Sequence, residues 1–307
     1  MSFSITLATV LLMLAYSVPG YALVKSGKLP AKHIPSFANV LLYVNSPMQT
    51  MYAMQKIEFS GYMVKYLGIA LLCGTVMMGG MLALCYALFR SKQERVIYRI
   101  VVASAAMGNC GFMGIPMVEA LMPDYPQGVA FTSGFFLAMN ILMWTAVSFI
   151  YTRDSRYISV KKIFLNPATI AMGVSLILFF GRIDLHPSVV TFINVLGTMA
   201  TPLCMLILGM RLGAIPLKPM FTQPLQYLAC ALKLIAFPLL AYALLYFAPV
   251  ERSFAQTIFI VCAMPVGNLV LSFAEILGEG QDAAANIVLL STILSMVTVP
   301  VMMLLIN

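Results

Sequence analysis

Two stretches of the chain combine glycine, proline and asparagine in a pattern that could bind a negatively charged molecule. The first reads GNCGFMGIP from Gly108 to Pro116, and the second reads PVGN from Pro265 to Asn268. Glycine and proline at this density interrupt a helix, and a helix that restarts carries about half a positive charge at its N-terminus. Two such ends that meet would form an anion site.

The side chains at these interruptions add hydrogen-bonding groups. The amides of Asn109 and Asn268 both donate and accept, and Pro116 suits the first position of a resumed helix. The alternative is a pair of proline kinks filled by packing, with no ligand. The predicted substrate-binding residues are Asn109, Cys110, Gly111, Gly267, Asn268, Asn45 and Thr50, and those that shape the breaks are Gly108, Gly114, Pro116 and Pro265.

Asn45, Thr50 and Thr201 lie in two further apolar segments beside prolines, Pro47 and Pro202. A hydroxyl or amide beside a proline also repairs the backbone hydrogen bonds that the proline leaves open. Ligand contact and backbone repair therefore both stay open for these residues. The same two readings apply to polar residues near the breaks on other segments, namely Thr132, Ser133, Asn140, Asn286, Ser291 and Thr292.

Three ionisable residues within or near apolar segments are candidates for a coupling or charge role: Lys233, Glu275 and Glu119. A charge inside a membrane span costs at least ~2.5 kcal/mol and marks a functional hypothesis. Lys233 could instead extend its stem to the membrane surface. Glu119 and Glu275 could bind a cation or a proton, or could simply be solvated at helix ends.

The composition requires these residues to be positioned within a membrane. Of 307 residues 62% are hydrophobic and 9% are charged, and the mean hydropathy is +0.96. Soluble domains are close to half apolar and a quarter charged. The six cysteines lie in apolar runs without a CxxC pair, so neither a disulfide framework nor a metal site is expected, and no cofactor is expected.

Polar breaks divide the chain into ten apolar segments, which are long enough for spanning helices and too long for barrel strands. They lie near residues 3–24, 34–55, 62–89, 96–122, 127–151, 167–183, 187–210, 223–248, 253–277 and 283–306. Alternate loops hold 13 of the 18 Lys and Arg residues, and the opposite loops hold 4. This bias predicts a multi-pass protein of a cytoplasmic (inner or plasma) membrane with both termini outside. The net charge of +8 is interpreted as this orientation signal, and no nucleic acid is expected as a partner.

The two halves of the chain resemble each other. Phe37, Asn39 and Pro47 recur as Phe192, Asn194 and Pro202 at an offset of 155 residues. We interpret residues 1–151 as one five-helix repeat and residues 167–307 as a second. Because five is odd, the second repeat would be inverted, as in many secondary transporters. Chance similarity between apolar helices is the alternative.

The run from Gly108 to Pro116 resembles the fourth-span signature of the auxin efflux carrier family, whose members include the plant PIN-FORMED proteins. Pro265 to Gly267 is similar to the Pro-x-Gly motif of its ninth span, and the likeness covers the whole chain. The resemblance implies a fold similar to the bile acid sodium symporters: ten helices in two inverted repeats, with helices 4 and 9 broken and crossing. Spans 1, 2, 6 and 7 would form a scaffold, and spans 3–5 and 8–10 a transporter domain that moves as an elevator.

By position, the resemblance implies that Asn109 is the asparagine of the substrate site, that Pro116 and Pro265 are the crossover prolines, and that Thr50 is a small hydroxyl of the second span. It also implies a homodimer. The chain departs from the family at Asn268, where the plant carriers have an apolar residue. It lacks the acidic residue that the sodium-coupled relatives carry at the second crossover, so neither auxin nor sodium is assigned.

The function expected from these features is secondary transport, by a carrier or uniporter, of a small organic anion such as a carboxylate. The anion and membrane lipid are the expected partners, and the coupling ion is left open. An anion channel or ligand sensor on the same scaffold is the alternative. An enzyme is not expected, because the spans contain no HExxH motif, paired aspartates or Ser–His arrangement.

Overall fold

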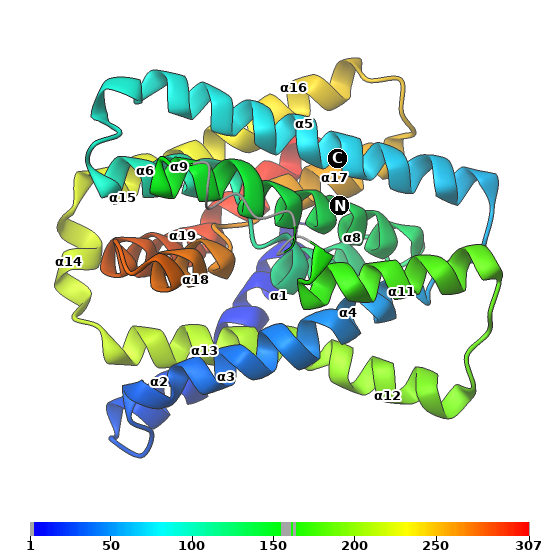
Figure 1. Ribbon diagram of the computed structural model, residues 1–307, viewed down its shortest axis with the longest axis horizontal. Coiled ribbons are helices and arrows are strands. Elements are labelled where there is room, and N and C mark those ends of the chain that lie inside the picture. Colours follow the sequence, from blue (N-terminus) through cyan, green and yellow to red (C-terminus); the bar gives the residue numbers. More distant parts are fainter. Residues whose placement is uncertain (1–2, 155–160, 162–163, 307) are drawn as a thin grey trace.

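The computed structural model describes residues 3–154, 161 and 164–306, and the regular elements in this range are helices (Figure 1). Those of the first half are α1 (Phe3–Ala15), α2 (Ser17–Lys25), α3 (Ile34–Val40), α4 (Ser46–Met54), α5 (Gly61–Leu88), α6 (Val96–Ala106), α7 (Ile115–Leu121), α8 (Gln127–Leu142) and α9 (Ser148–Thr152). Those of the second half are α11 (Pro167–Gly181), α12 (Pro187–Thr198), α13 (Ala200–Ala214), α14 (Leu217–Thr222), α15 (Pro224–Ala231), α16 (Phe237–Phe247), α17 (Arg252–Cys262), α18 (Asn268–Leu277) and α19 (Gln281–Met303).

Six helical stretches of the described residues are long and apolar enough to cross a membrane: Phe3–Lys25, Gly61–Leu88, Gln127–Thr152, Pro187–Ala214, Pro224–Phe247 and Gln281–Ile306. Shorter apolar helices cover Val96–Ala106, Cys110–Leu121, Pro167–Gly181 and Arg252–Cys262. The all-helical prediction is confirmed. Two predicted segments, 96–122 and 253–277, are each divided into two helices.

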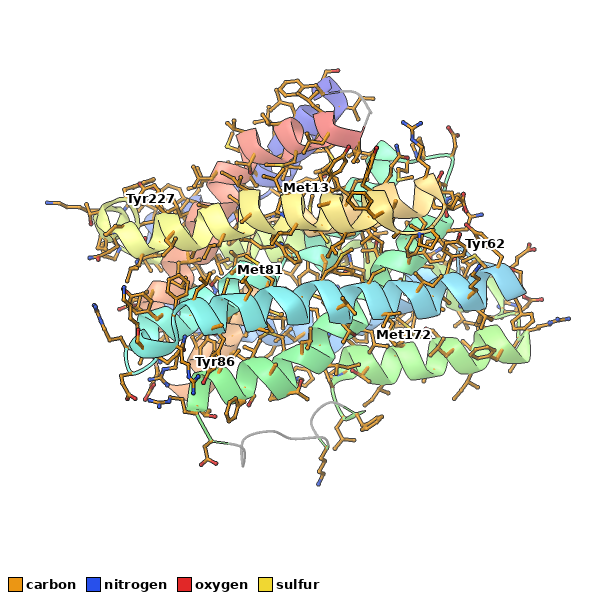
Figure 2. The ribbon with its side chains drawn as sticks, turned by 90° about the horizontal axis from the view of Figure 1, so that it is seen from above. Met13, Tyr62, Met81, Tyr86, Met172 and Tyr227 are labelled. Carbon is orange, nitrogen blue, oxygen red and sulfur yellow. The ribbon has the colours of Figure 1, made fainter. Side chains whose placement is uncertain are left out.

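The length and end residues of α5 match a membrane span. Figure 2 shows Tyr62 and Tyr86 near opposite ends of this helix. At 1.5 Å per residue their backbones are about 36 Å apart along the axis, slightly more than the ~30 Å apolar layer of a bilayer. Tyrosine is enriched at both membrane surfaces. Between them, Leu72 and Val76 present exposed apolar side chains that lipid would cover.

Helical segments pack against each other in a regular pattern. α2 packs along α13, and α4 packs against both α11 and α12; α5 packs on α8, and α15 packs on α6 and α19. The contact between α2 and α13 is close because glycine lies at it. A methyl group at Gly209 would lie 1.8 Å from the backbone oxygen of Ser17, and one at Gly20 would lie 2.0 Å from that of Leu206. Membrane helices use small residues in this way to approach closely.

Three prolines inside helical runs follow a widened, π-helical turn. These turns are Leu41–Asn45 before Pro47, Cys110–Gly114 before Pro116, and Leu232–Ala236 before Pro238. A proline in a helix clashes with the carbonyl of the preceding turn and donates no hydrogen bond. A wider turn at that point absorbs both effects, so the chain bends without ending the helix. The helix that carries Pro116 therefore resumes at Cys110, and the expectation that Pro116 opens it is wrong.

Loops that alternate along the chain gather at two ends of the molecule. At one end, Arg153 pairs with Glu94, and Arg99 pairs with Glu279. At the other end, the Tyr62 hydroxyl lies 2.8 Å from that of Tyr125 and hydrogen-bonds to Glu251. Two of the charges used for the orientation prediction, Arg156 and Lys162, lie outside the described residues.

Candidate functional site

The two glycine- and proline-rich stretches form interruptions that meet. In the first break, residues 107–109, the chain is extended between the end of α6 and the π turn Cys110–Gly114. In the second break, residues 263–267, the chain passes from α17 to α18. Gly108 and Val266 pair as an antiparallel bridge. The backbone N–H of Asn109 donates to the oxygen of Pro265 at 2.7 Å, and that of Gly267 donates to Met107 at 3.0 Å.

The bridge satisfies backbone groups that would otherwise be buried without partners. A third bond joins it to α19, because the N–H of Val266 donates to the Ser291 hydroxyl at 3.1 Å. A methyl group at Gly267 would lie 2.7 Å from the oxygen of Gly108, so only glycine allows this approach. The backbone groups that form the bridge are therefore paired with each other. By helix geometry, the first-turn N–H groups after each break are the ones left without an intrahelical acceptor.

Asn109 and Asn268 lie at the starts of the two resumed helices. Asn109 is 5% exposed, and its carbonyl accepts from the N–H groups of Met113 and Gly114. Asn268 is the first residue of α18, and its side-chain nitrogen donates to the sulfur of Cys204 on α13 at 2.9 Å. The Asn268 side-chain oxygen is buried and has no hydrogen-bond partner among the described residues. The structure therefore brings both predicted asparagines to the meeting point.

Cys110, Gly111 and Gly114 form the π turn that follows the first break. The Cys110 sulfur lies 3.5 Å from that of Met139 on α8. Two neighbouring helices hold the carbonyls of this turn: Gln49 of α4 donates to Gly111 at 3.4 Å, and Thr201 of α13 donates to Phe112 at 2.8 Å. Sequence reasoning missed Gln49. Its position one turn after Asn45 on an apolar helix was the signal that could have found it.

Asn45 and Thr50 are buried but form hydrogen bonds away from the breaks. Asn45 donates to the carbonyl of Leu196 on α12 at 2.8 Å, and Thr50 donates to that of Ser46 at 3.2 Å. Neither residue lines the cavities described below. Thr50 therefore bonds within its own helix, whereas Asn45 joins its helical run to α12.

Lys233 reaches the meeting point from the π turn between α15 and α16. Its side chain is 0% exposed, and its Nζ donates to the Cys262 carbonyl at 2.8 Å. A methyl group at Gly108 would lie 3.0 Å from this nitrogen. The nitrogen also lies 4.3 Å from the centre of the Phe237 ring. Lys233 therefore does not extend to the membrane surface, and its ammonium stands at the C-terminal, negative end of α17.

No carboxylate of the described residues lies within ion-pair distance of the Lys233 nitrogen. A buried charge without a counter-charge is costly. The carbonyl of Cys262 and the face of Phe237 supply part of the compensation. The part of the positive charge that these groups do not compensate makes the meeting point electropositive. A positive potential there favours an anion nearby.

Glu119 and Glu275 each form an ion pair, on α7 and α18 respectively. Glu119 binds Lys56 and accepts a hydrogen bond from the Tyr52 hydroxyl at 2.9 Å, while Glu275 binds Arg211. Burial lowers the pKa of Lys56. The hydrogen bonds and charges of Glu119 and Tyr52 together raise it by more than burial lowers it, so the pKa of Lys56 lies above its ordinary value. At neutral pH Lys56 is therefore charged.

Cavities lie on both sides of the break region. One of about 290 Å³ is bounded by Phe112, Phe136, Asn140, Trp144 and the first turns of α18, including Leu269 and Phe273. A small neighbour of about 20 Å³ includes Asn268, Phe112 and Arg211. Another cavity, of about 350 Å³, lies on the other side of the break region. Its lining includes Gln49, Tyr52, Pro116, Glu119 and Thr201.

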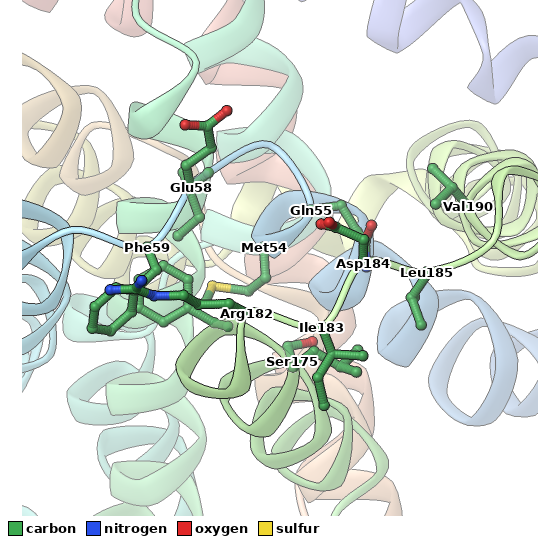
Figure 3. Close-up of a pocket in the computed structure, with 13 residues that line it drawn as sticks. Met54, Gln55, Glu58, Phe59, Ser175, Arg182, Ile183, Asp184, Leu185 and Val190 are labelled. Carbon is green, nitrogen blue, oxygen red and sulfur yellow. The ribbon is translucent and has the colours of Figure 1, made fainter.

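A further cavity, larger than these at about 630 Å³, lies away from the breaks. Figure 3 shows it between the loop that carries Glu58 and Phe59 and the connection from α11 to α12, with Arg182 and Asp184 beside it. The Arg182 guanidinium stacks 4.7 Å from the centre of the Phe59 ring. The lining of this cavity is charged and open, which fits a vestibule at one end of the molecule better than a closed site.

Comparison with known proteins agrees with this architecture. Residues 3–161 and 151–303 match the family model described as membrane transport protein. The chain belongs to the membrane transport protein family. It is also 22% identical over 306 residues to a protein named an uncharacterized transporter from Methanocaldococcus jannaschii, covering 96% of this chain and 97% of that protein. As a member of the membrane transport protein family, this chain has a transport role.

Proposed function

We propose that this protein is a secondary transporter, a carrier or uniporter, of a small organic anion such as a carboxylate. The observation that carries the proposal is the meeting of two interrupted helices at the bridge between Gly108 and Val266. Broken helices in corresponding positions of two halves are the best sequence pointer to a transporter's binding site. The N-termini that follow the breaks and the ammonium of Lys233 all favour an anion.

The proposed binding residues are Asn109, Cys110, Gly111, Gly267 and Asn268. The cavity of about 290 Å³ is lined by Phe112 and Leu269, which adjoin these residues in the chain, and it gives room for a small molecule, at the lower limit of ordinary ligand sites. Asn268 offers a buried oxygen without a partner, and this acceptor suits a hydroxyl or protonated group of the ligand. Lys233 would balance the negative charge without a contact of its own.

We also propose the ten-span inverted repeat, as in the auxin efflux carriers that the sequence resembles. Helix packing supports this repeat. In the repeat, α2 corresponds to α11, and α13 corresponds to α4. The packing of α2 on α13 therefore has its counterpart in the packing of α11 on α4. On this basis, a scaffold comprises α1–α4 and α11–α13, and a transporter domain comprises α5–α9 and α15–α19. When the second moves, the side-chain contacts between the two need to break, such as the hydrogen bonds of Gln49 and Thr201 and the ion pairs of Glu119 and Glu275.

Alternating access by an elevator movement would carry the anion with the transporter domain. A negative cytoplasm drives an anion outward with about 2.3 kcal/mol per charge per 100 mV. Export therefore needs no coupling ion. We propose a cytoplasmic membrane with the Lys- and Arg-rich loops inside and both termini outside.

The proposal is tested on purified protein in two steps. First, a thermal-shift screen of small mono- and dicarboxylates identifies ligands, because binding to the folded state raises the apparent stability. Second, the best ligand is loaded into proteoliposomes for counterflow. Saturable counterflow supports a carrier. Ohmic current far above ~10³ ions per second exceeds ordinary turnover and would identify a channel, whereas binding without flux would identify a sensor.

A further inference from the structure

Two ion pairs join the helices beyond the breaks to their neighbours. Lys56, in the loop after α4, pairs with Glu119 of α7, and the Tyr52 hydroxyl donates to the same carboxylate at 2.9 Å. Arg211, in the last turn of α13, pairs with Glu275 of α18, and its second nitrogen lies 3.3 Å from the second carboxylate oxygen. Each pair connects an element of the proposed scaffold to an element that follows a break.

The two pairs correspond to each other within the internal repeat. Arg211 lies 155 residues after Lys56, the same offset that relates Phe37 to Phe192. Glu275 lies 156 residues after Glu119, whereas the asparagines at the two breaks, Asn109 and Asn268, lie 159 residues apart. Lys56 and Arg211 therefore match in the repeat, and the two glutamates lie on corresponding helices within one turn of matching positions. A chance surface contact would not be expected to recur in this way.

The pairs lie at opposite ends of the molecule. Lys56 follows the C-terminal end of the helical run from Ile34 to Met54, in the loop that leads to α5 at the right of Figure 1. Arg211 lies where α13 approaches α14 at the left of the same view, and α13 there packs against residues 31–33, before the start of that helical run. Each pair also borders a cavity: Glu119 lines that of about 350 Å³, and Arg211 lines that of about 20 Å³.

We propose that Lys56–Glu119 and Arg211–Glu275 are paired latches, one at each end, and that each must break before the cavity beside it opens. The inference rests on the proposed alternating movement and names the contacts that control it. A latch of this kind must be weak enough to open. The side chains are partly solvated, at 29% and 31% exposed for the first pair and 14% and 36% for the second. Ion pairs with this exposure shift an equilibrium only modestly.

The chain contains a matched control for these pairs. Glu94 and Arg153 also form an ion pair between segments distant in sequence. Both belong to the proposed transporter domain, one before α6 and the other after α9. Loss of this pair changes the charge in the same way. The pair does not, however, connect the proposed scaffold to the proposed transporter domain.

The test measures cavity opening by the labelling rate of reporter cysteines in detergent. Thr9→Cys reports on the cavity that Glu119 lines, and Ala38→Cys reports on the cavity that Arg211 lines. We expect Glu119→Gln to speed maleimide labelling at position 9 about two- to fivefold and to slow it at position 38. Glu275→Gln is expected to do the reverse. Glu94→Gln is expected to change neither rate, and the double variant Glu119→Gln/Glu275→Gln to return both rates toward the parent values.

Equal changes at both reporters, or changes no larger than those of Glu94→Gln, would overturn the proposal. Exchange of the charges, as Lys56→Glu with Glu119→Lys, is expected to restore the parent labelling rates. Without that recovery, the effect of Glu119→Gln would be a packing defect and the latch would be rejected. Labelling requires no substrate, so its outcome stands even if no anion is transported. Conversely, anion transport with unshifted labelling would reject the latches and leave the proposed function intact.

Discussion

The ammonium nitrogen of Lys233 lies 2.8 Å from the carbonyl oxygen of Cys262, the last residue of α17. The second break begins directly after this carbonyl. A positive charge is thereby fixed at the end of one interrupted helix and against Gly108 of the other. The position is 0% exposed, so the charge acts through a medium that screens little.

Lys233→Met tests whether this charge serves anion binding. Methionine keeps most of the volume but removes the charge and the donor. We expect transport efficiency to fall about 10- to 100-fold, because a unit charge several ångströms from the anion contributes about 2 kcal/mol at an effective dielectric constant of ~20. The melting temperature is expected to stay close to that of the parent, because removal of an uncompensated buried charge offsets the lost bond. Lys65→Met, an exposed lysine on α5, is the control. Unchanged kinetics in Lys233→Met would leave the lysine a structural role only.

Asn109→Ala tests the first break as part of the binding site. The Asn109 side chain is buried, whereas its backbone holds the bridge to Pro265, which alanine preserves. We therefore expect the protein to fold normally and ligand-dependent thermal shift and counterflow to be lost. The control is Asn39→Ala, an exposed asparagine on α3. Transport by Asn109→Ala at the parent rate would remove this residue from the site.

Gly267→Ala tests the close approach of the two breaks. The added methyl group would lie 2.7 Å from the backbone oxygen of Gly108, and neither backbone can turn aside as a side chain would. We expect a loss of about 1–3 kcal/mol of stability, as for other overpacked positions, together with reduced transport. Gly173→Ala is the control, because a methyl group there has open space around it. The melting temperatures of the two variants make the comparison, and equal values would contradict the tight contact.

The location of the breaks was predictable, but the way they are joined was not. Three glycines and a proline between Gly108 and Pro116 are poor residues for a helix interior wherever they occur. The pairing of Gly108 with Val266 depends instead on how segments far apart in sequence are brought together. Lys233 shows the same limit: its stem can reach either the membrane surface or the breaks, and only the packing of α15 on α6 and α19 determines which. The exact helix start at Cys110 also escaped prediction, because a π turn accommodates Pro116.

Ser291→Ala tests the support that α19 gives to the second break. The Ser291 hydroxyl accepts the N–H of Val266 and donates to the carbonyl of Val288 at 2.9 Å. Alanine would leave a buried N–H without a partner, at a cost of about 1–3 kcal/mol. Ser295→Ala is a matched control, because that hydroxyl donates to Thr292 within its own helix. We expect a lower melting temperature for Ser291→Ala than for Ser295→Ala, and the opposite order would show that the Val266 bond contributes nothing.

Transport is expected to persist when sodium is replaced by choline. Sodium coupling requires oxygen ligands for the cation at the moving site, and the residues of the two breaks, 107–109 and 263–267, include no aspartate or glutamate. The ammonium of Lys233 lies against this region and would repel a sodium ion. The measurement is the initial rate of anion counterflow in proteoliposomes with equal osmolarity and either cation on both sides. Equal rates support movement of the anion without sodium coupling, whereas a strict requirement for sodium would show that a cation site exists despite the fixed charge.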